Sequence, residues 1–239
     1  RPVVEQEQYG CYHSCLAAAK GGGVTVRTFD FGADRTMADA HQGPESSKLG
    51  LRGIRSSLRR PHQFETPLCA LLRAAAGGPL RVMFPMVAHL EEWDEAMKRV
   101  EHCRQQLRER GERFNEKTPF GVMFSVPSAC LTAEEFVARG CDFFVIETND
   151  LTQYTHAVDR DLSIAERYYR PASHAMKKLI AMVMEAADAG QIPVTICGMA
   201  VGNPANTIQY LKLGLRSFSM SPQSLIGVKR ALLEADSRD

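Results

Sequence analysis

The sequence predicts an α/β fold in which short parallel strands alternate with helices. Six short apolar runs, rich in residues that favour strands, take turns with stretches that have the spacing of amphipathic helices. Polar residues gather directly after the apolar runs, as they do at the carboxyl ends of parallel strands. With 239 residues the chain fits one α/β domain and can bury a sizeable core.

Glycine, proline and polar residues bound the predicted strands. In chain order the strands cover residues 23–30, 80–87, 120–125, 141–146, 192–198 and 215–220. The third strand stops before Pro127, because the residue ahead of a proline favours an extended end to the element. The fourth follows Gly140 and is almost entirely apolar, which is typical of a strand buried on both faces.

Helices are predicted between and after these strands. They cover residues 91–110, a stretch ending at residue 139, and residues 173–189, 204–213 and 224–234. A loop is expected between the strand at 141–146 and the helix at 173–189. Six β-then-α units fit either an open doubly wound sheet or most of an eight-stranded barrel, and periodicity does not separate the two.

Composition narrows the class of protein. The net charge is +1 and its charges are scattered, so no nucleic-acid partner is expected. The apolar runs have strand length, and no signal peptide or membrane span is predicted. Seven cysteines without a CxxC pair argue against a disulfide framework or a structural zinc site and favour a reducing cytoplasm.

Asn149 and Asp150 directly follow the buried strand at 141–146. At the carboxyl end of a parallel strand they can hold a metal, a phosphate or a carbonyl group. The same residue types also cap helices, so the cap and the ligand site remain open alternatives.

Charged and nucleophilic side chains follow the other strands. They are Arg27 with Asp30, Ser125 and Cys197. Arg52 and Arg55 follow residues 49–51, and Arg160 follows the loop at Tyr154. Arginine is rarely buried without a partner, and its planar fork suits phosphate and carboxylate oxygens. Several arginines beside the carboxylate of Asp150 therefore predict a site for a phosphorylated carboxylic acid and a hard divalent cation.

Several runs resemble one family. They are residues 27–32, 49–55, 83–86, 121–123, 148–160, 197–198 and 218–221, and they cover nearly the whole chain in the family's order. The chain resembles the phosphoenolpyruvate-binding C-terminal domain of the phosphoenolpyruvate–protein phosphotransferases of bacterial sugar uptake, with pyruvate phosphate dikinase and phosphoenolpyruvate synthase as relatives. The run at 148–160 is the most specific of these.

The resemblance implies a TIM (β/α)8-type barrel, a homodimer in the cytoplasm and a ligand at the strand carboxyl ends. Arg27, Arg52 and Arg160 would clamp the phosphoryl group, and Asn149 would bond it or the substrate carboxylate. Asp150 would hold Mg²⁺. Cys197 would protonate the enolate to give pyruvate, a role that suits a thiol with a reference pKa of about 8.5.

Three positions depart from the family pattern. Ser125 stands where the family has a metal-binding glutamate, so weakened Mg²⁺ binding is expected. Met199 stands where a glutamate usually follows the cysteine, which predicts slower proton delivery. Glu147 replaces a glycine; its carboxylate either replaces part of the metal site or faces away, and strand alternation favours facing away.

The resemblance implies that residues 1–239 carry about six β/α units of the family barrel, without its first two strands. The histidine that accepts the phosphoryl group and passes it to a phosphocarrier protein is expected on an upstream domain outside these residues. Two open sheet edges predict an oligomeric or poorly stable isolated chain.

Three functions compete at this point. The leading one is phosphoryl transfer from phosphoenolpyruvate to a histidine with release of pyruvate. The second is a catalytically impaired homologue that senses phosphoenolpyruvate or serves as an interaction module, which Ser125 and Met199 favour. The third is a carbon–carbon lyase of the citrate-lyase type, which ranks last because those barrels lack the run at 148–154.

Overall fold

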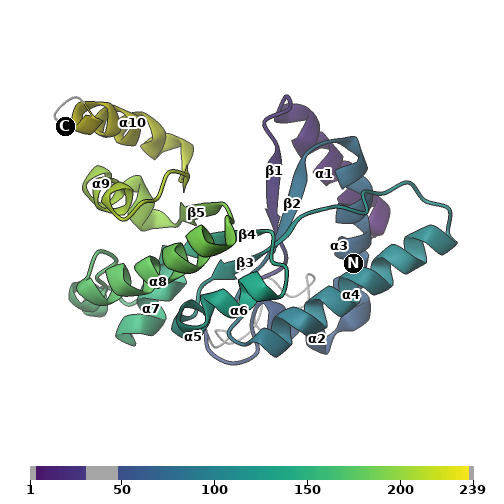
Figure 1. Ribbon diagram of the computed structural model, residues 1–239, viewed down its shortest axis with the longest axis horizontal. Helices are drawn as coiled ribbons and strands as arrows, with labels where there is room; N and C mark the ends of the chain where they lie inside the picture. The colour runs from purple at the N-terminus through teal and green to yellow at the C-terminus, as the bar shows by residue number, and fades with distance from the viewer. Residues whose placement is uncertain (1–3, 31–47, 237–239) are drawn as a thin grey trace. The chain divides into compact units, whose positions relative to one another are not determined.

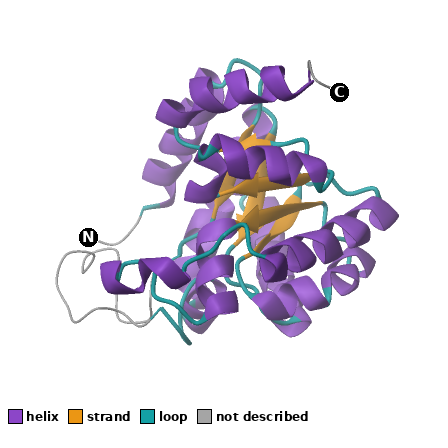
Figure 2. Ribbon diagram, turned by 90° about the vertical axis from the view of Figure 1, so that its left-hand side faces the viewer, coloured by secondary structure: helices purple, strands orange, loops and turns teal. Residues whose placement is uncertain are grey.

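The computed structural model describes residues 4–30 and 48–236. Phe31 and Gly32, which end the first of the family runs, lie outside the described residues. The chain divides into two compact units, Arg1–Gly121 and Val122–Asp239. Strands and helices alternate along both, and Figure 2 distinguishes the helices from the strands by colour. Within the described ranges, no helix has the length and apolar character needed to cross a membrane.

The first unit contains a pair of parallel strands. Its elements are α1 (Glu5–Ala18), β1 (Val24–Arg27), α2 (Ile54–Arg59), α3 (Pro61–Ala74), the 3-10 turn η1 (Ala75–Gly77), β2 (Leu80–Phe84) and α4 (Leu90–Glu109). β1 and β2 lie side by side (Figure 1), with Val24 opposite Leu80 and Arg27 opposite Met83. Because β1 and β2 are parallel, their carboxyl ends lie at the same edge of the sheet.

Aromatic rings form the core of the first unit. The ring of Phe84 lies 6.0 Å from that of Phe64, 5.8 Å from that of Trp93 and 5.6 Å from that of Phe120, measured between centroids. All four side chains are buried. Such clusters combine large apolar area with favourable ring geometry, so this core anchors β2 between α3 and α4.

The second unit repeats the β/α pattern. Its elements are β3 (Phe120–Phe124, which begins just before the boundary), α5 (Pro127–Leu131), α6 (Ala133–Ala138), β4 (Phe143–Glu147), α7 (Thr148–His156), η2 (Ser163–Tyr168), α8 (His174–Gly190), β5 (Val194–Cys197), η3 (Met199–Gly202), α9 (Pro204–Lys212), β6 (Phe218–Ser219) and α10 (Pro222–Asp236). Its core centres on Phe124, whose ring packs edge-on against Phe136 and Phe144.

Strand order separates the two folds that periodicity left open. Within each unit the hydrogen-bonded strands follow one another in chain order, and the β1–β2, β4–β5 and β5–β6 pairs are parallel. A doubly wound sheet reverses its strand order at a switch point, whereas a barrel does not. The architecture therefore confirms the predicted α/β fold built from β/α units of the barrel type.

Local capping signals explain why several helices start where predicted. The Ser173 hydroxyl accepts the Met176 N–H at 3.2 Å and starts α8. The Glu92 carboxylate accepts the N–H groups of Ala88 and His89 and starts α4. These bonds satisfy donors that have no partner inside the helix, so α4 and α8 begin within a residue of their predicted positions.

The prediction of a loop after the fourth strand was wrong. Helix α7 follows β4 without a break, from Thr148 to His156. Its N-cap is Glu147, a residue that seldom caps helices, so the start signal was not recognised. Helices α1, α2 and α3 were not predicted, and β6 is two residues long where residues 215–220 were expected.

Candidate functional site

In the first unit, two arginines bind one buried aspartate. The Asp30 side chain is 3% exposed and accepts two parallel N–H bonds from Arg52, at 2.9 and 3.0 Å. Arg27, at the end of β1, donates to the same carboxylate at 3.2 Å. Two guanidinium groups thus bind one carboxylate, and the planar guanidinium fork also suits the oxygens of a small anion.

A tight turn holds Arg52 in this position. The Arg52 N–H donates to the Gly50 carbonyl at 3.0 Å, and Gly53 has a φ of +59°. A Cβ on Gly53 would come within 2.7 Å of the Met86 Cβ, so a larger residue would push the turn away from the loop after β2. The turn presents the Arg52 guanidinium to Asp30.

In the second unit, Asp150 and Arg160 form an ion pair at the start of α7. The Asp150 side chain is 3% exposed and its Oδ1 accepts from Arg160 at 3.1 Å. The Arg160 backbone N–H donates to Gln153 Oε1 at 3.2 Å, which ties the loop after α7 to the helix itself. The predicted association of Arg160 with Asp150 is therefore present within this unit.

Asn149 is held through both its side chain and its backbone. Its Oδ1 accepts the Met199 N–H at 2.9 Å, so the amide NH2 is the group suited to bond an anion. The Tyr169 hydroxyl donates to the Asn149 carbonyl at 3.3 Å. Burial raises the pKa of Tyr169 to about 12, so this donor stays protonated at neutral pH.

Glu147 does not face away from the site, contrary to the expectation from strand alternation. Its Oε1 accepts the Asn149 N–H at 2.9 Å and its Oε2 accepts the Asp150 N–H at 2.6 Å. Residue 147 ends β4, and the turn into α7 brings its carboxylate back over the first helical turn. Burial raises the pKa of Glu147, against the opposing effect of these N–H bonds.

Cys197 lies at the carboxyl end of β5, opposite Glu147 in the strand register, and is partly exposed. Its carbonyl accepts from the Thr148 hydroxyl at 2.9 Å. Gly198 has a φ of +111°, and a Cβ there would come within 2.2 Å of the Thr148 Oγ1. Glycine is needed at this point because the exit of β5 runs directly against the first turn of α7.

Ser125 provides little to a metal. It is buried at the end of β3, and its hydroxyl donates to the Met123 carbonyl at 3.4 Å. Across residues 4–30 and 48–236 there is no group of three or more His, Cys, Asp or Glu side chains placed to hold a metal ion. Both Glu147 oxygens accept N–H bonds, and the Asp150 carboxylate pairs with Arg160.

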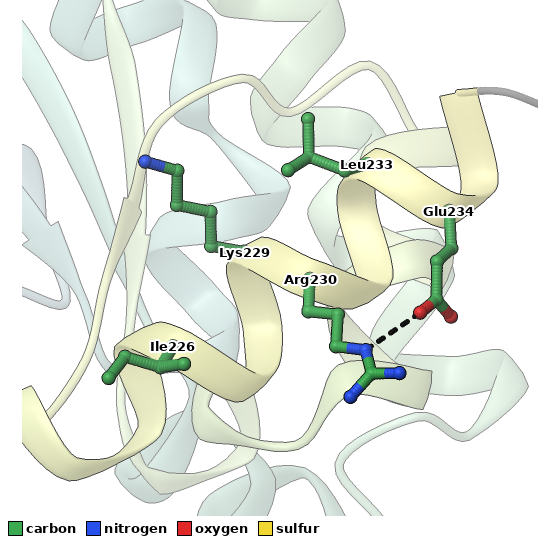
Figure 3. Close-up of a pocket in the computed structure, with 5 residues that line it drawn as sticks. All are labelled: Ile226, Lys229, Arg230, Leu233 and Glu234. Atoms are coloured by element: carbon green, nitrogen blue, oxygen red, sulfur yellow. Dashed lines mark hydrogen bonds and ion pairs between the residues drawn. The ribbon is translucent and has the colours of Figure 1, made fainter.

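A separate hollow of about 410 Å³ lies on α10 (Figure 3). Its lining consists of Ile226, Lys229, Arg230, Leu233 and Glu234. Arg230 and Glu234 form an ion pair at 2.9 Å across one turn. None of the predicted site residues lines this hollow, which therefore gives no support to a ligand site at α10.

Three residues of these clusters had no assigned role in the sequence prediction. They are Asp30, Gln153 and Tyr169. Asp30 stood among the polar residues after a strand, a signal that could have paired it with an arginine. Nothing in the local sequence indicates that the Tyr169 hydroxyl bonds the backbone of Asn149, because 20 residues separate the two.

Comparison with known proteins gives strong matches over the whole chain. The family described as the PEP-binding domain of PEP-utilising enzymes matches residues 1–237. The phosphoenolpyruvate-protein phosphotransferase of Cupriavidus necator is 40% identical over 97% of this chain and 40% of its own length. The multiphosphoryl transfer protein of Rhodobacter capsulatus is 36% identical over 100% of this chain and 28% of its own length. The chain spans less than half the length of either relative.

Solved structures confirm the fold class. An HpcH/HpaI aldolase/citrate lyase family protein from Burkholderia cenocepacia superimposes with a TM-score of 0.53 at 14% identity, over 95% of this chain and 90% of that chain. At this identity the likeness concerns the fold alone, which is an α/β fold of the TIM-barrel type. It gives no support to a lyase activity.

Proposed function

We propose that this chain, which belongs to the family of PEP-binding domains of PEP-utilising enzymes, binds phosphoenolpyruvate in a phosphotransferase. The longer protein would move the phosphoryl group to a histidine on another domain and release pyruvate, in the service of sugar uptake. The names of its relatives support this function. The observation that carries it is the grouping of Asn149, Asp150 and Arg160 around the first turn of α7.

Each substrate-binding residue has a proposed role. Arg27 and Arg52 bind phosphoryl oxygens, and Arg160 adds a third guanidinium. The Asn149 amide donates to the phosphoryl group or the substrate carboxylate. Phosphoryl transfer depends on positioning and charge neutralisation more than on covalent help, which suits guanidinium groups held by Asp30 and Asp150.

Cys197 is the proposed proton donor. When the bond between phosphorus and the enol oxygen breaks, the phosphoryl group passes to the acceptor and the enolate of pyruvate remains. The Cys197 thiol gives its proton to the methylene carbon, which forms the methyl group of pyruvate, and the thiolate regains a proton from water. Its partial exposure at the end of β5 suits this exchange.

Mg²⁺ is the proposed cofactor, with Asp150 as its ligand from this chain. A single carboxylate fits the way Mg²⁺ is held, by one or two carboxylates together with water and substrate oxygens. The ion would neutralise charge on the phosphoryl group. Because Ser125 offers a neutral hydroxyl and Glu147 bonds backbone N–H groups, this site is weaker than one with two carboxylates.

The remaining proposals concern the whole protein. Residues 1–239 would form one PEP-utilising C-terminal domain, which is supported by a family match over 1–237. The protein would be a cytoplasmic homodimer, and a domain upstream of this one would pass the phosphoryl group to a phosphocarrier protein. Relatives with a longer chain support the presence of further domains.

Calorimetric titration tests the function. We expect the folded chain to bind phosphoenolpyruvate and to bind it more tightly when Mg²⁺ is present. Supplying the histidine domain should then yield pyruvate. A folded chain that does not bind phosphoenolpyruvate with or without Mg²⁺ would contradict the proposed function. An affinity for phosphoenolpyruvate that does not change when Mg²⁺ is added would contradict the proposed cofactor.

Ser125→Glu tests the proposed metal site. The added carboxylate should raise Mg²⁺ affinity in the presence of phosphoenolpyruvate by roughly tenfold or more, because a charged oxygen replaces a neutral hydroxyl. Ser125→Gln is the matched control, since it brings the same bulk into a buried position without the charge. Equal Mg²⁺ affinity in the two variants would show that residue 125 is not near the metal.

A further inference from the structure

Glu147 lies at the junction of three elements of the second unit. It is the last residue of β4, the N-cap of α7 and the register partner of Cys197 in β5. Only 4% of its surface is exposed. A carboxylate is seldom buried without compensating bonds, so its partners explain how it is tolerated there.

Those partners are the backbones of the residues proposed to bind substrate and metal. Both Glu147 oxygens accept N–H bonds, from Asn149 at 2.9 Å and from Asp150 at 2.6 Å. The first N–H groups of a helix have no acceptor within the helix and carry its positive end, so they stabilise a negative charge. A Cβ built on Gly198 would lie 3.1 Å from Glu147 Oε1, so the carboxylate also lies close to the residue that follows β5.

The charge balance around α7 follows from this placement. Glu147 and Asp150 supply two buried carboxylates, and Arg160 supplies a guanidinium that lies 3.1 Å from Asp150 and 4.0 Å from the exposed carboxylate of Asp161. The first-turn N–H groups, which would favour an anion, already bond Glu147. A glycine at residue 147, as in the family that the chain resembles, would remove one of the two buried carboxylates and leave the ion pairs of Arg160 in place.

We propose that Glu147 is a specificity-determining residue that lowers the affinity of this chain for phosphoenolpyruvate, by placing a second buried negative charge against Asn149 and Asp150. The inference rests on the proposed function, because it concerns the same substrate. Repulsion between like charges is large where water is excluded and grows with the charge of the ligand. A ligand with one carboxylate is therefore affected less than phosphoenolpyruvate, which carries a phosphate as well.

The test compares Glu147→Gly and Glu147→Gln with the original chain by calorimetry in Mg²⁺-containing buffer. Both variants should bind phosphoenolpyruvate roughly tenfold more tightly. The gain for pyruvate should be smaller, which a purely structural cap would not produce. Glu134→Gln is the matched control: Glu134 is an exposed carboxylate in the first turn of α6, and its removal should leave both affinities unchanged.

Glu147→Gln keeps the side-chain volume and one acceptor oxygen, so it remains informative if Glu147→Gly does not fold. Folded Glu147 variants that bind phosphoenolpyruvate no more tightly than the original chain would overturn the inference alone. An equal gain for pyruvate would also overturn it. If neither the original chain nor the folded variants bind phosphoenolpyruvate, the result contradicts the proposed function itself, and the inference about Glu147 falls with it.

Discussion

Cys197→Ser is expected to slow pyruvate formation by roughly a hundred- to ten-thousandfold, the usual range for loss of a general acid. The hydroxyl of serine is a much weaker acid than a thiol, so the enolate has no efficient proton donor. Serine has nearly the same shape, and the backbone bond from Thr148 to the residue 197 carbonyl does not depend on the side chain. Phosphoenolpyruvate affinity should therefore change less than twofold.

The measurement is pyruvate release with the histidine domain supplied, alongside calorimetric binding of phosphoenolpyruvate. Cys15→Ser serves as the control, because Cys15 is an exposed thiol on α1 and has no proposed role. A Cys197→Ser protein that releases pyruvate within threefold of the original rate would remove Cys197 from the reaction. Equal losses in the Cys15 and Cys197 variants would point to a general effect of the substitution.

Arg52→Ala is expected to weaken phosphoenolpyruvate binding by about 2–3 kcal/mol, or roughly 30- to 150-fold, since a charged hydrogen-bonding group is lost. Two hydrogen bonds to Asp30 already fix the Arg52 guanidinium, so little further side-chain entropy is lost when a ligand binds. Thermal stability should also fall, because the buried Asp30 carboxylate loses the partner that donates two hydrogen bonds to it.

Asp30→Asn separates binding from stability. This variant breaks the Arg52–Asp30 ion pair, as Arg52→Ala does, and the Arg27–Asp30 pair as well. It keeps both guanidinium groups, so it should lose stability and still bind phosphoenolpyruvate at least as tightly. Arg108→Ala should change neither property much, because Arg108 pairs with Glu101 and Glu116 at the surface. If Asp30→Asn loses affinity as strongly as Arg52→Ala, Arg52 acts by holding the turn and does not bind the substrate.

Much of the fold was predictable because strand and helix patterns are local. The buried strand before Glu147 and the helix after Ser173 were found from apolar runs and capping signals. Helix α7 was missed because its cap is a glutamate, whose capping role depends on burial against the exit of β5. The length of β6 was also overestimated, since the short pairing of Phe218 and Ser219 with β5 depends on the partner strand.

The site divides in the same way. The amino-acid sequence alone established the β/α order, the family resemblance and the candidate residues Arg27, Arg52, Asn149, Asp150, Arg160 and Cys197. Only the folded chain showed that Asp30 holds two arginines and that Glu147 bonds the backbone at Asn149 and Asp150. The residue types alone determine which charged groups a chain carries. The pairing of those groups depends on strand register and on the positions of helix N–H groups that lack an acceptor within the helix, and both are set by the packing of the folded chain.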